Sequence, residues 1–158
     1  MTIDLPQDIE FKTMHTLQLV ALDEHILTML GQNPEVEVHL GCDSQNTGPH
    51  TIYVTALVFR FPNNGAHVVF KREKLPRIND MWTKLWGETE RSVMYAHWIR
   101  EKCRVKVKQI DLDFNSDPAY PSNRILGASE GYVRSLGFEP KAKPNLLMAA
   151  WAANVLCQ

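Results

Sequence analysis

Acidic residues at three places in the sequence have the types and positions that could perform chemistry. Asp43 ends a predicted strand, VEVHLGCD, just before a polar segment. Asp111 and Asp113 occupy alternate positions at the end of a later predicted strand, so both point to the same sheet face. Asp113 is nearer the strand end, where open α/β sheets bind ligands. Each residue could also be an ordinary turn former or a solvated strand end, so its role depends on how the surrounding elements position it.

The third acidic position lies in a predicted helix over residues 79–103. Glu88 falls on one stripe with Leu85 and Ser92 by steps of three and four, a stripe that continues through apolar positions. A carboxylate on a core-facing stripe is costly unless it is paired or bound to a metal. Glu88 is therefore the favoured acid, although a helix rotated by one position would favour Glu90.

These acids become one site if the first and fourth predicted strands are neighbours, because Asp43 and Asp113 are then adjacent and the helix delivers Glu88. Three close carboxylates repel one another unless a cation neutralises them. Hard oxygen donors without a histidine or cysteine cluster favour Mg²⁺ or Mn²⁺ over Zn²⁺. Two such ions fit phosphodiester hydrolysis, in which they activate a water and stabilise the leaving oxygen.

The elements that must position the acids follow from periodicity and turn signals. Apolar residues at helical spacing predict a helix over residues 13–31, and alternation then predicts an antiparallel meander. Its strands cover residues 36–43, 51–61 and 66–71, joined by turns at 44–50 and at PNNG, 62–65. After the helix at 79–103 come a strand at 104–114, a helix at 122–136, a short extended piece at 138–143 and a helix from 145 to the end. This order predicts one α/β domain over residues 1–158, with residues 1–34 as a helical N-terminal extension.

Composition narrows the class of protein. The 158 residues carry a net charge of −1, but residues 1–58 sum to −7 and the remainder to +6. The second part could meet an anionic partner, although on charge alone an ordinary mixed surface is the more common interpretation. No apolar run is long enough for a membrane span, and the acidic N-terminus does not resemble a signal peptide. Three widely spaced cysteines without a CxxC pair favour a reducing, cytoplasmic location over a disulfide scaffold.

Five segments together resemble the YkuK-like family of predicted ribonuclease H-related nucleases. They are HLGCDSQ (39–45), TIYVTALVF (51–59), LWGETERSVMYA (85–96), IDLDFN (110–115) and GYVRSLGFEPKAKPN (131–145). The resemblance covers most of the chain from about residue 35 to the end. It implies a ribonuclease H-like fold with a mixed sheet of about five strands, three antiparallel and then parallel, flanked by helices.

By this resemblance Asp43, Glu88 and Asp113 take the metal-ligand positions for two Mg²⁺ or Mn²⁺ ions. The family more often carries histidine where this chain has Asp111, which favours Asp113 as the ligand. The family's last helix commonly carries an aspartate where this chain has Asn154. The neutral amide can offer one oxygen as a fourth ligand but removes a negative charge from the site.

The expected partner is nucleic acid, either RNA, DNA or a hybrid, and other side chains could contact it. Ser44 and Gln45 could bind a metal's water or a phosphate, or equally could stabilise a turn. Lys141 and Lys143 could bind backbone phosphates. For the lysines singly, and for the basic residues at 72, 74 and 77, a solvated surface is the more common role.

The leading hypothesis is a metal-dependent nuclease. The rival is a catalytically impaired nucleic-acid-binding or scaffold protein that keeps the fold, and Asn154 is the residue that favours it. A phosphotransferase on the related actin-like fold ranks last, because the sequence has no glycine-rich phosphate loop.

Overall fold

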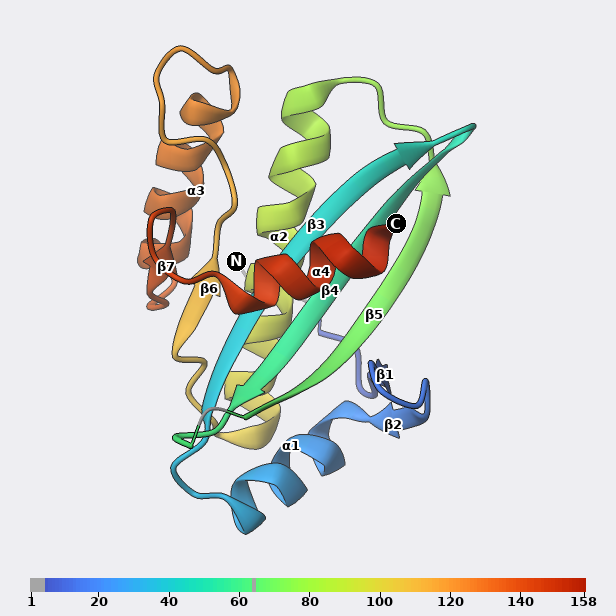
Figure 1. Cartoon of the computed structure of the whole chain (residues 1–158), viewed down its shortest axis with the longest axis vertical. Coiled ribbons are helices and arrows are strands. Elements are labelled where there is room, and N and C mark those ends of the chain that lie inside the picture. The colour runs from blue at the N-terminus through green and yellow to red at the C-terminus, as the bar shows by residue number, and fades with distance from the viewer. Residues whose placement is uncertain (1–4, 64) are drawn as a thin grey trace.

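A seven-stranded mixed sheet organises the chain, in the strand order β2-β1-β5-β4-β3-β6-β7 (Figure 1). The computed structural model describes residues 5–63 and 65–158. The strands are β1 (Glu10–Thr13), β2 (Leu19–Ala21), β3 (Glu37–Thr47), β4 (His50–Arg60), β5 (Ala66–Pro76), β6 (Gln109–Asp111) and β7 (Pro140–Lys141). The helices are α1 (Leu22–Gln32), α2 (Met81–Cys103), α3 (Ser122–Ser135) and α4 (Met148–Cys157).

The long strands β3, β4 and β5 form an antiparallel meander at the centre of the sheet. In its register Asp43 lies opposite Val54, and Val54 lies opposite Arg72. β4 is buried from Thr51 to Phe59 because it has a strand on either side and helices over both faces. β6 and β7 add parallel strands beyond β3.

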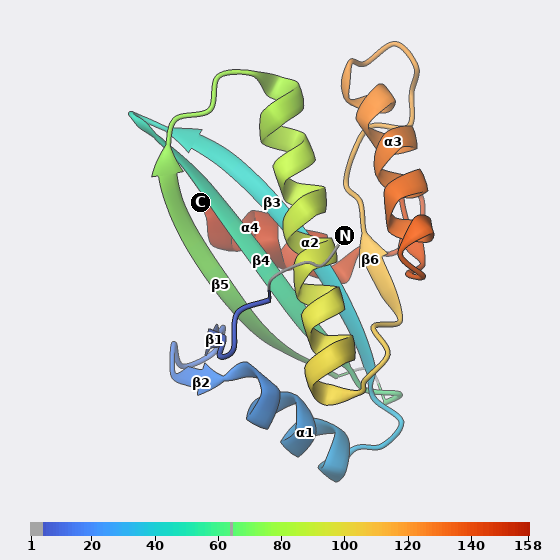
Figure 2. The same ribbon diagram turned by 180° about the vertical axis from the view of Figure 1, so that it is seen from behind.

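The helices lie in two unequal layers. α4 crosses one face of the sheet, and α2 runs along the other, as the two opposite views show (Figures 1 and 2). α2 contacts both α1 and α3 and, with them, covers the larger hydrophobic core, where Trp98 is fully buried. Under α4 lies a smaller apolar cluster that includes Val54, Phe70 and Ala153.

α4 approaches β3 so closely that one position requires glycine. A Cβ atom added at Gly41 would lie 2.5 Å from the backbone nitrogen of Ala150, well inside contact distance. Because side chains alternate along a strand, Gly41 and Asp43 face α4 while Cys42 and Ser44 face α2. The glycine of the HLGCDSQ segment therefore serves packing, and it sets the distance between α4 and the strand that carries Asp43.

The mixed α/β architecture with a ribonuclease H-like strand arrangement is confirmed, but the sheet has seven strands rather than about five. The two additional strands come from the N-terminal segment. β1 pairs with β2, and it also pairs with β5 at Lys12 and Thr13.

The helix predicted over residues 13–31 is correct only in its second half. Residues 10–21 form the β1–β2 hairpin, which turns through Leu17 in the left-handed conformation at φ 58°. The helical spacing of Met14, Leu17 and Val20 misled the prediction, because pairing with β5 overrides local periodicity. The N-terminal extension is thus a hairpin followed by a helix.

Several strand boundaries also differ. The predicted turn at 44–50 is mostly strand, since β3 continues to Thr47 and the chain reverses at Gly48, whose φ is 56°. β5 continues through the basic segment to Pro76. The predicted strand at 104–114 forms ladder bonds only as β6, although Val105 and Val107 alternate with exposed lysines before it. In the predicted PNNG turn, Pro62 and Asn63 form a turn and Asn64 lies outside the described residues.

In the described part of the chain no helix combines the length and apolar character needed to cross a membrane.

Candidate active site

Asp43 lies in the middle of β3 on the face covered by α4. The amide nitrogen Nδ2 of Asn154, from the last turns of α4, donates a hydrogen bond to its Oδ2 at 3.0 Å. The Sγ of Cys157 donates to its backbone oxygen at 3.3 Å. The carboxylate is half-buried, so it keeps access to solvent while α4 fixes its position. Asn154, which the family resemblance implies as a fourth ligand through its oxygen, lies beside Asp43 and presents its Nδ2 donor to it.

Glu88 lies on α2, on the other side of β3, and its side chain is buried, with the residue only 5% exposed. The Ser44 hydroxyl donates to its Oε2 at 2.5 Å. Because Ser44 directly follows Asp43, this bond ties the acid of α2 to the strand that carries the other acid. Gly87 permits the approach, since a Cβ atom there would overlap the hydroxyl of Tyr53 on β4.

Asp113 follows β6 by two residues and is exposed. Its Oδ1 lies 3.0 Å from the ammonium Nζ of Lys143, in the loop between β7 and α4. Its charge raises the pKa of both Asp43 and Glu88, though it is a lesser cause at each. Asp113 is therefore close enough to act electrostatically on both other acids.

The electrostatics of the three acids reflect burial and mutual repulsion. Burial, and next the charge of Asp43, raise the pKa of Glu88 to about 8, against the opposing effects of Ser44 and Lys84. Burial also raises the pKa of Asp43, while hydrogen bonds from Asn154 and from the Ser44 backbone lower it. Glu88 is thus largely protonated at neutral pH in the absence of a cation.

The two alternative acids lie elsewhere. Asp111 is 2% exposed, and its Oδ2 accepts hydrogen bonds from the backbone nitrogens of Ala149 and Ala150 at 2.9 and 3.1 Å. It therefore satisfies the free N–H groups at the start of α4. Glu90 is exposed on α2 and lines a separate hollow beside Tyr132.

The predicted substrate contacts are scattered. Ser44 is engaged with Glu88, Gln45 is exposed on β3, and Lys143 is paired with Asp113. Lys141 lies on β7 with its Nζ 3.6 Å from Glu139. Of these four, Ser44 and Lys143 contact an acid of the site.

Sequence reasoning missed Lys84. Its Nζ donates to the backbone oxygen of Ser44 at 3.3 Å, and its charge lowers the pKa of both Asp43 and Glu88. The sequence contained a signal for Lys84, because it precedes Glu88 by four residues on the same helix and so shares its face. Lys84 and Lys143 together place two ammonium groups of the chain's own beside the acids.

The acids suit Mg²⁺ or Mn²⁺ in chemistry, since all three offer carboxylate oxygens. Within residues 5–63 and 65–158, however, no three histidine, cysteine, aspartate or glutamate side chains are arranged closely enough to hold an ion. Glu88 is hydrogen-bonded to Ser44, the residue after Asp43, whereas the carboxylate of Asp113 would have to exchange its contact with Lys143 for one with a metal.

The fold and the positions of the acids define a class. Strands β5, β4, β3, β6 and β7 lie in that order, the first three antiparallel, with acids on β3, on α2 and just after β6. This arrangement is ribonuclease H-like. A family model described as Ribonuclease H-like matches residues 21–158, and the chain belongs to this family. Neither a curated protein nor a solved structure gives a significant match.

Proposed function

We propose that this protein is a nuclease that hydrolyses phosphodiester bonds of RNA or DNA with Mg²⁺ or Mn²⁺. Membership of the ribonuclease H-like family supports a nuclease-like or nucleic-acid-related role in general. We further infer that the chain belongs to the YkuK-like group within it, on the segments that include Asp43, Glu88 and Asp113.

The observation that carries the proposal is that side chains from β3, α2, α4 and the segment after β6 gather around Asp43. Ser44 joins Glu88 to the strand of Asp43 at 2.5 Å, and Asn154 contacts Asp43 at 3.0 Å. Asp113 acts electrostatically on both acids. The buried carboxyl group of Glu88, held beside a second acid, costs folding free energy, and this cost supports a functional role.

In this proposal Asp43 and Glu88 hold the metal, and Asp113 completes the site. Bound divalent ions would supply the activated water and stabilise the leaving oxygen. The chain's own contribution is positional. Ser44 orients Glu88, Asn154 orients Asp43, and Lys84 offers a positive charge where a scissile phosphate would approach.

The test is cleavage of labelled single-stranded RNA, single-stranded DNA and hybrid duplexes with Mg²⁺ or Mn²⁺. Asp43→Asn should abolish cleavage, because the amide keeps the shape of the side chain but removes its charge. Glu90→Gln, on the exposed side of α2, is the matched control and should cleave at the rate of the parent chain. Cleavage that survives in Asp43→Asn would refute the assignment.

A second function is favoured by the contacts of Asn154 and Lys143. These residues offer hydrogen-bond donors to Asp43 and Asp113 where a metal would otherwise bind. A ribonuclease H-like protein that binds nucleic acid without cleaving it fits this arrangement. Calorimetric titration with Mn²⁺ separates the two functions: heat of binding that disappears in Glu88→Gln supports the nuclease, and no binding at millimolar metal supports the binding protein.

A further inference from the structure

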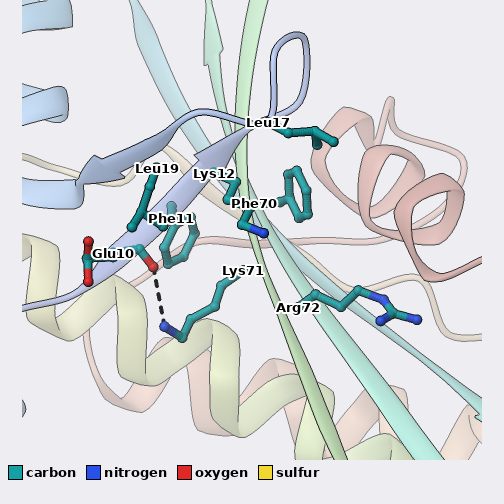
Figure 3. A pocket seen from close by; sticks show the side chains of 8 residues that line it. All are labelled: Glu10, Phe11, Lys12, Leu17, Leu19, Phe70, Lys71 and Arg72. Carbon is teal, nitrogen blue, oxygen red and sulfur yellow. Dashed lines mark hydrogen bonds between the residues drawn. The ribbon is translucent and has the colours of Figure 1, made fainter.

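A hollow of about 410 Å³ lies where β1 meets β5 (Figure 3), and none of the three acids lines it. Its apolar lining comes from Phe11, Phe70 and two leucines of the β1–β2 hairpin, Leu17 and Leu19. We call it the β1–β5 groove. The leucines are 61% and 55% exposed, so two large apolar side chains flank one opening. Its size is in the range of small-ligand sites.

The hairpin holds Leu17 at the groove in an unfavourable backbone conformation. Leu17 has φ 58°, in the left-handed region that residues other than glycine, asparagine and aspartate seldom adopt. The turn is fixed by hydrogen bonds from the backbone nitrogens of Leu17 and Gln18 to Thr13, at 2.9 and 3.0 Å. Strain that presents an apolar side chain to solvent indicates a binding role. Residues 10–19 precede residue 21, where the match to the family model begins, so that match does not cover this wall of the groove.

Cations line the groove and continue along β5. Lys12, Lys71 and Arg72 line it, and Figure 3 shows Lys71 and Arg72 leaving β5 in opposite directions. Lys71 donates to the backbone oxygen of Glu10 at 3.3 Å. Lys12, Arg72 and Lys74 are exposed, and none of them forms a salt bridge with another residue in the described ranges. Such uncommitted charges suit an anionic partner.

The register connects these cations to the candidate active site. Asp43, Val54 and Arg72 lie side by side on three neighbouring strands, so they share the face that α4 covers in part. Lys74 is two residues further along β5 and points to the same face. With strands about 4.8 Å apart, the Cα atoms of Asp43 and Arg72 are roughly 10 Å apart. Val54 itself is fully buried under α4, so a chain of phosphates leaving Asp43 would pass around the C-terminal end of α4 to reach Arg72 and then the groove.

We propose that the β1–β5 groove binds the single-stranded continuation of a nucleic acid held at Asp43. Arg72, Lys74 and Lys12 contact its phosphates, and Leu17 and Phe70 contact an unstacked base. This inference rests on the proposed function, because it gives the form of that substrate. A single strand fits and a duplex does not, since only an unpaired base can leave its neighbours and enter an apolar hollow.

The first experiment measures affinity for labelled single-stranded oligonucleotides by fluorescence anisotropy over a range of salt concentrations. Arg72→Glu/Lys74→Glu should weaken binding at least about tenfold and reduce the salt slope by about 1.4, at about 0.7 for each phosphate contact. Lys102→Glu/Lys106→Glu is the matched control with the same charge change. Those lysines lie at the end of α2 and before β6, separated from β5 by β3 and β4.

The second experiment tests the apolar contact. Leu17→Gly relieves the left-handed strain and removes an exposed side chain, so the variant should fold. It should bind single strands several-fold more weakly with an unchanged salt slope, because no phosphate contact is lost. An unchanged affinity in this variant would overturn the base contact.

The remaining outcomes separate this inference from the proposed function. Equal losses in the groove and control variants, duplex binding as tight as single-strand binding, or equally tight binding of an acidic peptide would each overturn the groove. Asp43-dependent cleavage combined with groove variants that bind normally would overturn the groove alone. Groove-dependent binding of single strands without any cleavage would overturn the nuclease and leave the groove.

Discussion

Glu88 and Asp43 differ in burial and in the hydrogen-bond donors that they receive. Asp43 stays half-exposed and receives amide donors, whereas Glu88 is buried and receives the hydroxyl of Ser44. Burial and the charge of Asp43 raise the pKa of Glu88 to about 8. Ionisation of Glu88 in the folded protein is therefore unfavourable, and a bound cation would relieve this cost.

Replacing Glu88 by glutamine should increase the stability of the metal-free protein. The amide keeps an acceptor for the Ser44 hydroxyl and removes the buried ionisable group, so the free energy of unfolding at pH 7 should rise by roughly 1–3 kcal/mol. Urea unfolding in the presence of a chelator measures this change. In Mn²⁺ the order should reverse, because ligand binding stabilises only the chain that retains the carboxylate. A variant less stable than the parent without metal would contradict the argument.

Lys143 competes with a metal for Asp113, and its removal should therefore strengthen metal binding. The pair is partly exposed, so Lys143→Met should increase Mn²⁺ affinity by only about two- to fivefold, in line with the modest value of such ion pairs. Isothermal calorimetry gives the dissociation constant. Lys141→Met is the control, since Lys141 contacts Glu139 instead of a site acid. Equal changes in both variants would mean that only the overall charge matters.

At the scale of elements, α4 is the part whose position the site depends on most. Asp111 holds its start by accepting from Ala149 and Ala150, and Gly41 lets it lie directly on β3. These two contacts fix the helix so that Asn154, one turn later, reaches Asp43. An acid predicted as an alternative ligand thus serves to place the helix.

Gly41→Ala should destabilise the protein and move α4 away from β3. The new methyl group meets backbone atoms rather than a flexible side chain, so a cost of roughly 1–3 kcal/mol is expected. Gly127→Ala on α3 is the matched control. Nothing lies within 4 Å of its added Cβ, and the change should stabilise the helix by about 0.5–1 kcal/mol. Thermal unfolding compares the two variants, and hydrogen exchange of the α4 amides tests whether the helix has loosened. Equal stabilities would show that the close contact is absent in solution.

At the scale of the whole molecule, the N-terminal hairpin and α1 are attached to the edge of the sheet. Part of the attachment is a pair of histidines, His25 of α1 and His67 of β5, with their Nε2 atoms 2.8 Å apart. Burial lowers the pKa of both, and each is lowered further by a histidine neighbour, His67 for His25 and His15 for His67. The folded protein therefore favours the neutral form of both imidazoles, with one ring donating a hydrogen bond to the other.

Stability should fall in mild acid because of this pair. Since the folded pKa values lie below 6.5, the unfolded chain takes up protons first, and the free energy of unfolding decreases as pH drops from 6.5 through the folded pKa values. The midpoint of urea unfolding between pH 5 and 7.5 measures this. His67→Phe keeps an aromatic ring beside Phe59 and removes one titrating group, so its midpoint should vary less with pH. An equally steep dependence in that variant would assign the effect to other groups.

The sequence by itself determined the central elements and the candidate acids. Alternation predicted β3, and a run of β-branched and aromatic residues predicted β4. The stripe through Glu88 predicted which side of α2 faces inward, and Glu88 is indeed buried. These features could be predicted because alternation and helical periodicity are local properties of the chain. The roles of Asp43, Glu88 and Asp113 as metal ligands stay predictions.

Only the tertiary structure decided the extent of the sheet and the contacts of the acids. Residues 10–21 became strands because β5 offered a free edge. The paired residues, Lys12 with Phe70 and Thr13 with Val69, are 58 and 56 positions apart, so the pairing leaves no local signal. In the same way, alternation along the strand predicts the same sheet face for Asp111 and Asp113. In the structure the carboxylate of Asp111 accepts from the start of α4, whereas that of Asp113 pairs with Lys143. Local patterns state what an element is, whereas long-range contacts decide what each of its side chains touches.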